Sequence, residues 1–136
     1  MAAEILKTES LAIRCEEDIV LVRQKTRKLA ADIGMSIVDQ TKMVTAASEL
    51  ARNALIYGGG GEAIFEILEN STGQGLRIRF VDHGPGIPDI EQAMTDGFTT
   101  GNGLGLGLSG SKRLVNDFSI TSVVGEGTTV EITRWK

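Results

Sequence analysis

The sequence has almost no cysteine and no long apolar segment, and these two absences exclude several classes of protein. Its 136 residues include one cysteine, Cys15, which excludes an internal disulfide and a cysteine metal cluster. No apolar run approaches the roughly 20 residues that a membrane-spanning helix needs. The first ten residues lack the basic region and long apolar core of a signal peptide. We therefore expect a cytoplasmic protein that has no membrane partner.

An excess of basic charge is also absent. The formal net charge is −4 at pH 7, so nothing indicates nucleic acid or an acidic membrane as the main partner. Hydrophobic residues make up 41% of the chain and charged residues 24%, which is ordinary for a globular protein. Because the length suits one hydrophobic core, we expect a single domain over residues 1–136.

Glycine, in contrast, is abundant. Six of the 14 residues from Gly97 to Gly110 are glycine, and Gly103, Gly105 and Gly107 are spaced as GxGxG. The following SGSKRLVNDF is interpreted as an amphipathic helix. A glycine-rich loop that enters a helix presents free N–H groups and the positive end of the helix dipole, which together can hold a phosphate. Taken alone, a flexible surface loop explains this stretch equally well.

Hydrophobic periodicity predicts a strand, two long helices, a hairpin, an irregular loop, a further helix and a second hairpin. This order favours an α+β fold, a two-layer sandwich with a mixed, mostly antiparallel sheet and helices on one face. The lack of strand–helix–strand alternation argues against a doubly wound nucleotide-binding fold. We expect strands over residues 10–14, 62–68, 76–82, 119–124 and 128–135, and helices over about 16–33, 38–57, 90–94 and 109–118.

Glu49 and Asn53 are four residues apart in the second long helix, so they project from the same face. An asparagine there could offer its carbonyl oxygen to Mg²⁺, and a glutamate one turn away could accept a proton from a hydroxyl or water. The alternative is a pair of exposed polar neighbours without a ligand.

Asp82 ends a predicted strand and opens the sequence DHGPG. Its carboxylate could accept a hydrogen bond from an exocyclic amine such as that of adenine, while Gly84 and Gly86 would let a flat base approach the backbone. A tight turn capped by Asp82 is the simpler alternative. Likewise, a glycine-containing hairpin turn explains Gly127 and Thr128 without a ligand.

Taken in order, the motifs ExxxN, DxGxG, GxGxG before a helix, and GxGT span Glu49 to Thr128. This set resembles the ATP-binding domain shared by gyrase, Hsp90, histidine kinases and MutL, known as the GHKL or Bergerat fold. Nearly the whole chain matches the order of elements in that fold. One glycine motif is weak evidence, whereas four in register are strong evidence.

The resemblance implies a role for each motif. Asn53 would be the Mg²⁺ ligand and Glu49 the general base. Asp82 would hold the adenine amine, with Gly86 beneath the ring and Thr128 beside it, and residues from about 88 to 108 would form a lid over the phosphates. The implied ATP-binding residues are Asn53, Asp82, Gly84, Gly86, Ile87, Gly101, Gly103, Leu104, Gly105, Leu106, Gly107, Leu108 and Thr128.

Within the family, the chain is similar to the free-standing serine/threonine kinases of bacterial partner-switching systems, in particular the switch kinases of the stressosome. The relevant stretches are VDQTKMVTAASELARNALIY, DHGPGIPDI, DGFTTGNGLGLGLSGSKRLV and VVGEGT. A histidine kinase would need a phospho-acceptor histidine, but the one histidine, His83, lies inside the expected adenine loop. Lys112 or Arg113 would either add positive charge near the phosphates or lie on the surface.

This branch implies transfer of phosphate to STAS-domain proteins, namely the antagonist that sequesters the kinase and the scaffold of the stressosome. The released kinase would then bind and activate a PP2C-type phosphatase. A homodimer is possible, since related anti-sigma kinases dimerise. Three alternatives stay open: an anti-sigma-factor kinase, a nucleotide-gated binding module with little catalysis, and a simple ATPase.

Overall fold

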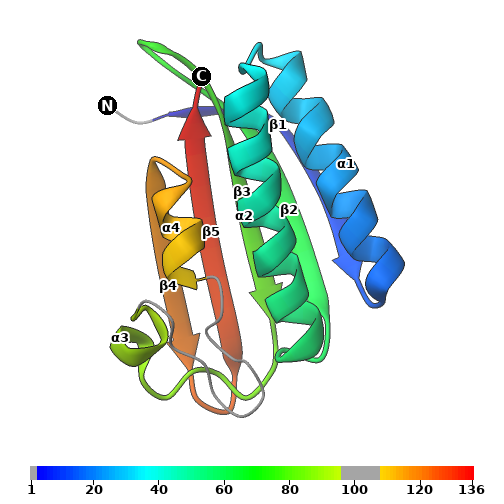
Figure 1. The fold of residues 1–136 in the computed structure, drawn as a ribbon, viewed down its shortest axis with the longest axis vertical. Coiled ribbons are helices and arrows are strands. Elements are labelled where there is room, and N and C mark those ends of the chain that lie inside the picture. Colours follow the sequence, from blue (N-terminus) through cyan, green and yellow to red (C-terminus); the bar gives the residue numbers. More distant parts are fainter. Residues whose placement is uncertain (1–2, 96–107) are drawn as a thin grey trace.

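The computed structural model describes residues 3–95 and 108–136, and these form one sheet with helices on one of its faces (Figure 1). None of the described helices is long and apolar enough to cross a membrane. The predicted α+β two-layer sandwich is confirmed. In chain order the elements are β1 (Glu4–Ile13), α1 (Glu16–Asp32), α2 (Ile37–Ile56), β2 (Gly61–Asn70), β3 (Gly73–Asp82), α3 (Ile90–Ala93), α4 (Leu108–Arg113), β4 (Asp117–Val123) and β5 (Gly127–Trp135).

The strand order in the sheet is β1-β2-β3-β5-β4, and the four pairings between these described strands are all antiparallel. The sheet is thus antiparallel throughout the described strands, where a mixed, mostly antiparallel sheet was expected. The chain reaches the far edge of the sheet as β4 before β5 returns between β4 and β3. This order places Asp82, the last residue of β3, opposite Thr128 near the start of β5.

Two elements differ most from the sequence prediction, while β2 and β3 are also longer than the expected 62–68 and 76–82. β1 begins at Glu4 rather than at residue 10, and its first five residues are all exposed. Polar and apolar residues do not alternate in EILKT, residues 4–8, so the sequence pattern does not predict a strand there. The helix expected over residues 109–118 ends at Arg113, because residues 117 and 118 pair with β5 as the start of β4.

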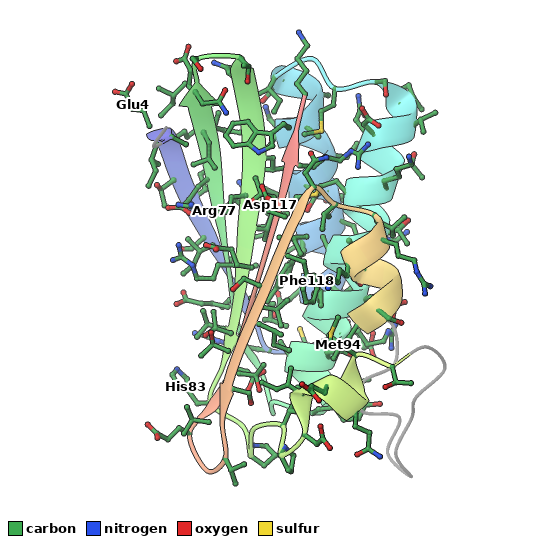
Figure 2. The ribbon with its side chains drawn as sticks, turned by 90° about the vertical axis from the view of Figure 1, so that its left-hand side faces the viewer. Glu4, Arg77, His83, Met94, Asp117 and Phe118 are labelled. Carbon is green, nitrogen blue, oxygen red and sulfur yellow. The ribbon has the colours of Figure 1, made fainter. Side chains whose placement is uncertain are left out.

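The hydrophobic core lies between the sheet and the helices α1 and α2. Met43 and Leu50 of α2 are buried in it with Phe65 of β2, each at most 2% exposed. Figure 2, turned by 90°, shows the helices on one side of the sheet and none of the described helices on the other. Because this buried stripe fixes the rotation of α2 about its axis, it also determines where Glu49 and Asn53 project.

Arg134 of β5 connects the end of α4 to the start of α2. Its Nη1 donates a hydrogen bond to the Leu114 carbonyl oxygen (2.9 Å), and its Nη2 lies 2.7 Å from Asp39 Oδ1. The Arg134 guanidinium thereby lowers the pKa of Asp39 below its usual range. This contact holds the short helix α4, whose first residue Leu108 borders the site described below.

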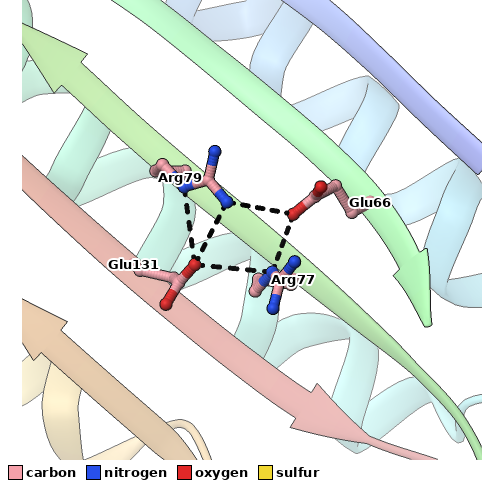
Figure 3. Close-up of polar contacts among 4 residues, drawn as sticks. All are labelled: Glu66, Arg77, Arg79 and Glu131. Carbon is pink, nitrogen blue, oxygen red and sulfur yellow. Dashed lines mark hydrogen bonds and ion pairs between the residues drawn. The ribbon is translucent and has the colours of Figure 1, made fainter. Parts of the chain in front are cut away.

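The face of the sheet opposite α1 and α2 carries a cluster of four charged residues: Glu66, Arg77, Arg79 and Glu131 (Figure 3). Arg77 Nε lies 2.7 Å from Glu66 Oε1, and Arg79 Nη2 lies 3.4 Å from Glu66 and from Glu131. The Glu66 side chain is 7% exposed and that of Glu131 32%. Hydrogen bonding to Glu66 raises the pKa of Arg77, although partial burial opposes this shift. The cluster therefore neutralises charge on neighbouring strands of this face.

Removing Glu66 should destabilise the fold more than removing Glu131. Glu66→Ala leaves two arginines without their most buried partner, so we expect the free energy of unfolding to fall by about 2 kcal/mol or more. Glu131→Ala removes a more exposed partner and should cost at most about 1 kcal/mol. Urea denaturation of both variants measures this difference, and equal losses would contradict the dependence on burial.

Candidate functional site

One pocket lies where α2 ends, β3 ends and β5 begins, at the lower end of the sheet in Figure 1. It brings together six of the residues that the motifs predicted: Asn53, Asp82, Gly86, Ile87, Leu108 and Thr128. The remaining lining is mostly apolar and comes from α2 and the two residues that follow it, from β3 and β5, and from the loop after β3. These further residues are Leu50, Ala54, Tyr57, Gly58, Phe80, Pro85 and Val130.

Asp82 is held in a fixed orientation by its own loop and by β5. Its Oδ1 accepts hydrogen bonds from the Gly84 N–H (3.0 Å) and the Thr128 N–H (3.3 Å). Among the described residues no group donates to Oδ2, which therefore stays available to a ligand. Asp82 thus caps a turn, as the simpler alternative proposed, and also borders the pocket.

The glycines around Asp82 are required by backbone packing. A Cβ on Gly127 would lie 2.1 Å from the Asp82 carbonyl oxygen, and one on Gly58 would lie 2.4 Å from the Asp82 side chain. A Cβ on Gly84 would lie 2.6 Å from the Gly58 Cα. Gly86 has a φ of +79°, and a Cβ there would meet the Val123 carbonyl oxygen at 2.6 Å. These contacts explain the glycines without reference to a bound base.

The loop after Asp82 is attached to the β4–β5 hairpin. The Gly125 N–H donates to the Pro85 carbonyl oxygen (2.9 Å), and the Ile87 N–H donates to Ser122 Oγ (2.7 Å). His83 in this loop is exposed, and its label in Figure 2 marks this end of the sheet. The pocket wall formed by Pro85, Gly86 and Ile87 therefore depends on the hairpin for its position.

Glu49 and Asn53 lie one turn apart on α2, and both are half-buried. Asn53 lines the pocket, whereas Glu49 lies beside it and is not part of the lining. Neither side chain has a hydrogen-bond partner among the described residues. The Asn53 backbone oxygen accepts hydrogen bonds from the Tyr57 and Gly58 N–H groups (2.9 and 3.2 Å), which ends the helix beside the pocket.

Some of the predicted site residues lie outside the pocket, and others are not among the residues that the structure describes. Gly84 packs against Gly58 and is not part of the lining. Lys112 and Arg113 are exposed at the end of α4. Outside the described residues lie the predicted phosphate-binding residues Gly101, Gly103, Leu104, Gly105, Leu106 and Gly107.

Several lining residues were missed because their sequence pattern also describes a core helix. Leu50, Ala54 and Tyr57 share one face of α2 at spacings of four and three residues, which is typical of a buried stripe. Gly58 directly follows the helix expected over about 38–57, where a glycine is explained as a helix stop. Ser122 does not line the pocket but contacts Ile87 and Thr128, which do, and it lies inside the strand expected over 119–124. Tyr57 and Gly58 follow Asn53 by four and five residues, so they lie about one helical turn after it. This spacing is the signal that could have placed them beside Asn53 in the pocket.

Substitution of Gly127 should damage the site more than substitution of Gly125 in the same turn. Both have positive φ, +135° and +84°, but a Cβ on Gly125 would meet nothing within 4 Å. Alanine at Gly125 should therefore cost about 1 kcal/mol from backbone strain alone. Alanine at Gly127 should cost about 2–3 kcal/mol more, because Asp82 must move. Denaturant titration of the two variants gives the comparison, and equal costs would exclude a packing role for Gly127.

Comparisons with known proteins identify the family of this chain. The family described as "Histidine kinase-, DNA gyrase B-, and HSP90-like ATPase" matches residues 38–136. The serine/threonine-protein kinase RsbT of Bacillus subtilis (strain 168) is 48% identical over 123 residues, which cover 90% of this chain and 92% of that protein. An anti-sigma F factor of Thermoanaerobacter sp. (strain X514) is 31% identical over 78% of this chain and 77% of its own length.

The fold is also found in a solved structure. The crystal structure of the RsbU and RsbW domains of Rv1364c from Mycobacterium tuberculosis matches with a TM-score of 0.65, at 21% sequence identity, over 95% of this chain and 32% of that chain. The chain therefore belongs to the histidine kinase-, DNA gyrase B- and HSP90-like ATPase family and, within it, to the serine/threonine-protein kinases related to RsbT and the anti-sigma F factors.

Proposed function

We propose that this chain transfers the γ-phosphoryl group of ATP to serine or threonine hydroxyls of STAS-domain proteins in a bacterial partner-switching pathway. Its family accounts for the use of ATP, and the 48% identity with a serine/threonine-protein kinase supports a protein acceptor. The observation that carries the proposal is the position of Asn53, Asp82 and Thr128 around one mostly apolar pocket, with Glu49 one helical turn from Asn53.

The inner part of the pocket is suited to an adenine ring. Apolar side chains such as Ile87 and Val130 can contact the faces of a flat base, while polar groups at one edge fix its orientation. Asp82 Oδ2 would accept a hydrogen bond from the exocyclic amine, since Oδ1 is already occupied by two backbone N–H groups. Gly86 also lines the pocket, and its backbone would lie against one face of the adenine ring.

Asn53 is the proposed Mg²⁺ ligand. Its side chain has no partner among the described residues, and an amide oxygen suits a cation that takes few protein ligands and keeps water and phosphate oxygens. Residues 3–95 and 108–136 contain no group of three or more His, Cys, Asp or Glu side chains that could hold a metal. When bound, Mg²⁺ would neutralise charge on the phosphates. The glycines from Gly101 to Gly107 are proposed to supply N–H groups to the same phosphates.

Glu49 is the proposed general base. The acceptor hydroxyl oxygen bonds to the γ-phosphorus as the bond from that phosphorus to the bridging oxygen of ADP breaks. Glu49 takes the hydroxyl proton during this step, and ADP leaves with the bridging oxygen. Because Glu49 is half-buried beside the pocket and has no partner among the described residues, its carboxylate is free to receive the proton.

The proposed substrates are the STAS-domain antagonist and scaffold of a stressosome. Phosphorylation of these proteins would release the kinase, which would then bind a PP2C-type phosphatase as a non-catalytic partner. The identity with RsbT over 90% of the chain supports this assignment over an anti-sigma-factor role, since the anti-sigma F factor relative is 31% identical over 78%. A homodimer is part of the same proposal.

Variants of Glu49 and Asn53 separate catalysis from binding. Glu49→Gln should lower the rate of phosphate transfer about 100-fold or more, because general base catalysis typically contributes that much. Its affinity for ATP should stay within about twofold, since Glu49 is not part of the pocket lining. Asn53→Ala should abolish the effect of Mg²⁺ on ATP affinity. Intact-mass spectrometry of a STAS-domain protein after incubation with Mg-ATP measures the transfer, and calorimetry measures the affinity.

Thr45→Ala, an exposed change one turn before Glu49, is the matched control and should transfer phosphate at the wild-type rate. A mass increase equal to one phosphate that appears with wild type and disappears in Glu49→Gln supports the kinase. Release of free phosphate without any change in acceptor mass would instead indicate an ATPase. Nucleotide binding without either product would indicate a nucleotide-gated binding module.

A further inference from the structure

Ser122, near the end of β4, connects three parts of the candidate site. Its Oγ accepts a hydrogen bond from the Ile87 N–H (2.7 Å). It also lies 2.8 Å from Thr128 Oγ1 and 3.2 Å from the Gly127 carbonyl oxygen. The residue is half-buried, and it borders the pocket only through these partners. One hydroxyl group therefore contacts the loop after Asp82, the first residue of β5 and a polar lining residue.

The three contacts fix the direction of the hydroxyl protons. A serine hydroxyl can donate one hydrogen bond and accept two. The Ile87 N–H can only donate, and the Gly127 carbonyl oxygen can only accept. If all three contacts are hydrogen bonds, the Ser122 proton goes to Gly127 and the Thr128 hydroxyl donates its proton to Ser122. Thr128 Oγ1 then has lone pairs, and no proton, to present to a ligand.

From this arrangement we infer that Ser122 is a positioning residue that makes Thr128 a hydrogen-bond acceptor and so selects a 6-aminopurine nucleotide over a 6-oxopurine nucleotide. The inference rests on the proposed adenine pocket. Asp82 Oδ2 and Thr128 Oγ1 would both be acceptors at one edge of the pocket, which suits the two N–H groups of an exocyclic amine. A carbonyl oxygen at position 6 would face lone pairs at Thr128 and find no donor there.

Loss of the Ser122 hydroxyl releases this constraint. Thr128 could then rotate its proton into the pocket and donate to a carbonyl oxygen, so the preference for ATP over ITP should decrease. The Ile87 N–H would also lose its partner, which should weaken the binding of both nucleotides to a similar extent. The ratio of the two affinities, rather than either affinity alone, therefore reports the orientation of Thr128.

The test compares Ser122→Thr with Ser122→Val in the full chain. These side chains have nearly the same shape, but only threonine keeps the hydroxyl. Calorimetry with Mg-ATP and Mg-ITP should give Ser122→Thr the wild-type affinity ratio, and Ser122→Val a ratio about three- to tenfold smaller, as expected for one hydrogen bond. Ser119→Ala, an exposed serine of the same strand, should leave the ratio unchanged. Urea denaturation checks that all variants are folded.

Asp82→Asn distinguishes failure of this inference from failure of the proposed pocket. We expect it to weaken ATP binding at least about tenfold, because a charged acceptor is lost. If ATP binding is unaffected, the base lies elsewhere and both proposals are overturned. If Asp82→Asn weakens binding but Ser122→Val and Ser122→Thr give the same affinity ratio, the pocket stands and the role of Ser122 is rejected.

Discussion

Close approach of three backbone segments at Asp82 is the constraint on which the site depends. The end of α2, the loop after β3 and the start of β5 meet at distances that exclude a side chain at Gly58, Gly84 or Gly127. The antiparallel pairing of β3 with β5 brings Asp82 and Thr128 together, and the Thr128 N–H then orients the Asp82 carboxylate. The pocket therefore forms where β3 ends and β5 begins beside the end of α2. Backbone N–H groups orient the Asp82 carboxylate at this point.

The sequence predicts most of the fold where each element has one buried and one exposed face. Polar and apolar residues alternate in β3 and β5, and β2 contains a run of apolar residues. The apolar stripe of α2 repeats at helical spacing. These patterns identified all four elements. The first half of β1 was missed because polar and apolar residues do not alternate in residues 4–8. The boundary between α4 and β4 was misplaced because pairing with β5, a contact distant in sequence, decides it. Local periodicity contains no information about such pairings.

The candidate site was predictable to a similar extent and for a similar reason. Asp82, Asn53 and Thr128 occur in motifs whose residue types suit a nucleotide, and the structure brings them to one pocket. The reason for the glycines was not predictable from the sequence. A Cβ at Gly58 or Gly127 would collide with Asp82, which is distant from both in the sequence and approaches them only in the folded structure. Ser122 was missed because its three partners come from segments up to 35 residues away. A serine in a strand has no local pattern that would distinguish it.

The two ends of the site differ in how stability and function are connected. At the end proposed to bind adenine, Asp82 and Thr128 belong to the hydrogen-bonded structure of the sheet. Changes to these two residues therefore affect folding as well as binding. On α2, the half-buried Glu49 and Asn53 make no hydrogen bond with any described residue. Neither side chain is among the buried polar groups without a partner, which in the described residues are Ser111 Oγ and Arg134 Nε, so water can satisfy both Glu49 and Asn53. Because neither side chain makes a hydrogen bond within the described part of the fold, both are available to a ligand, as the roles proposed for Glu49 and Asn53 require.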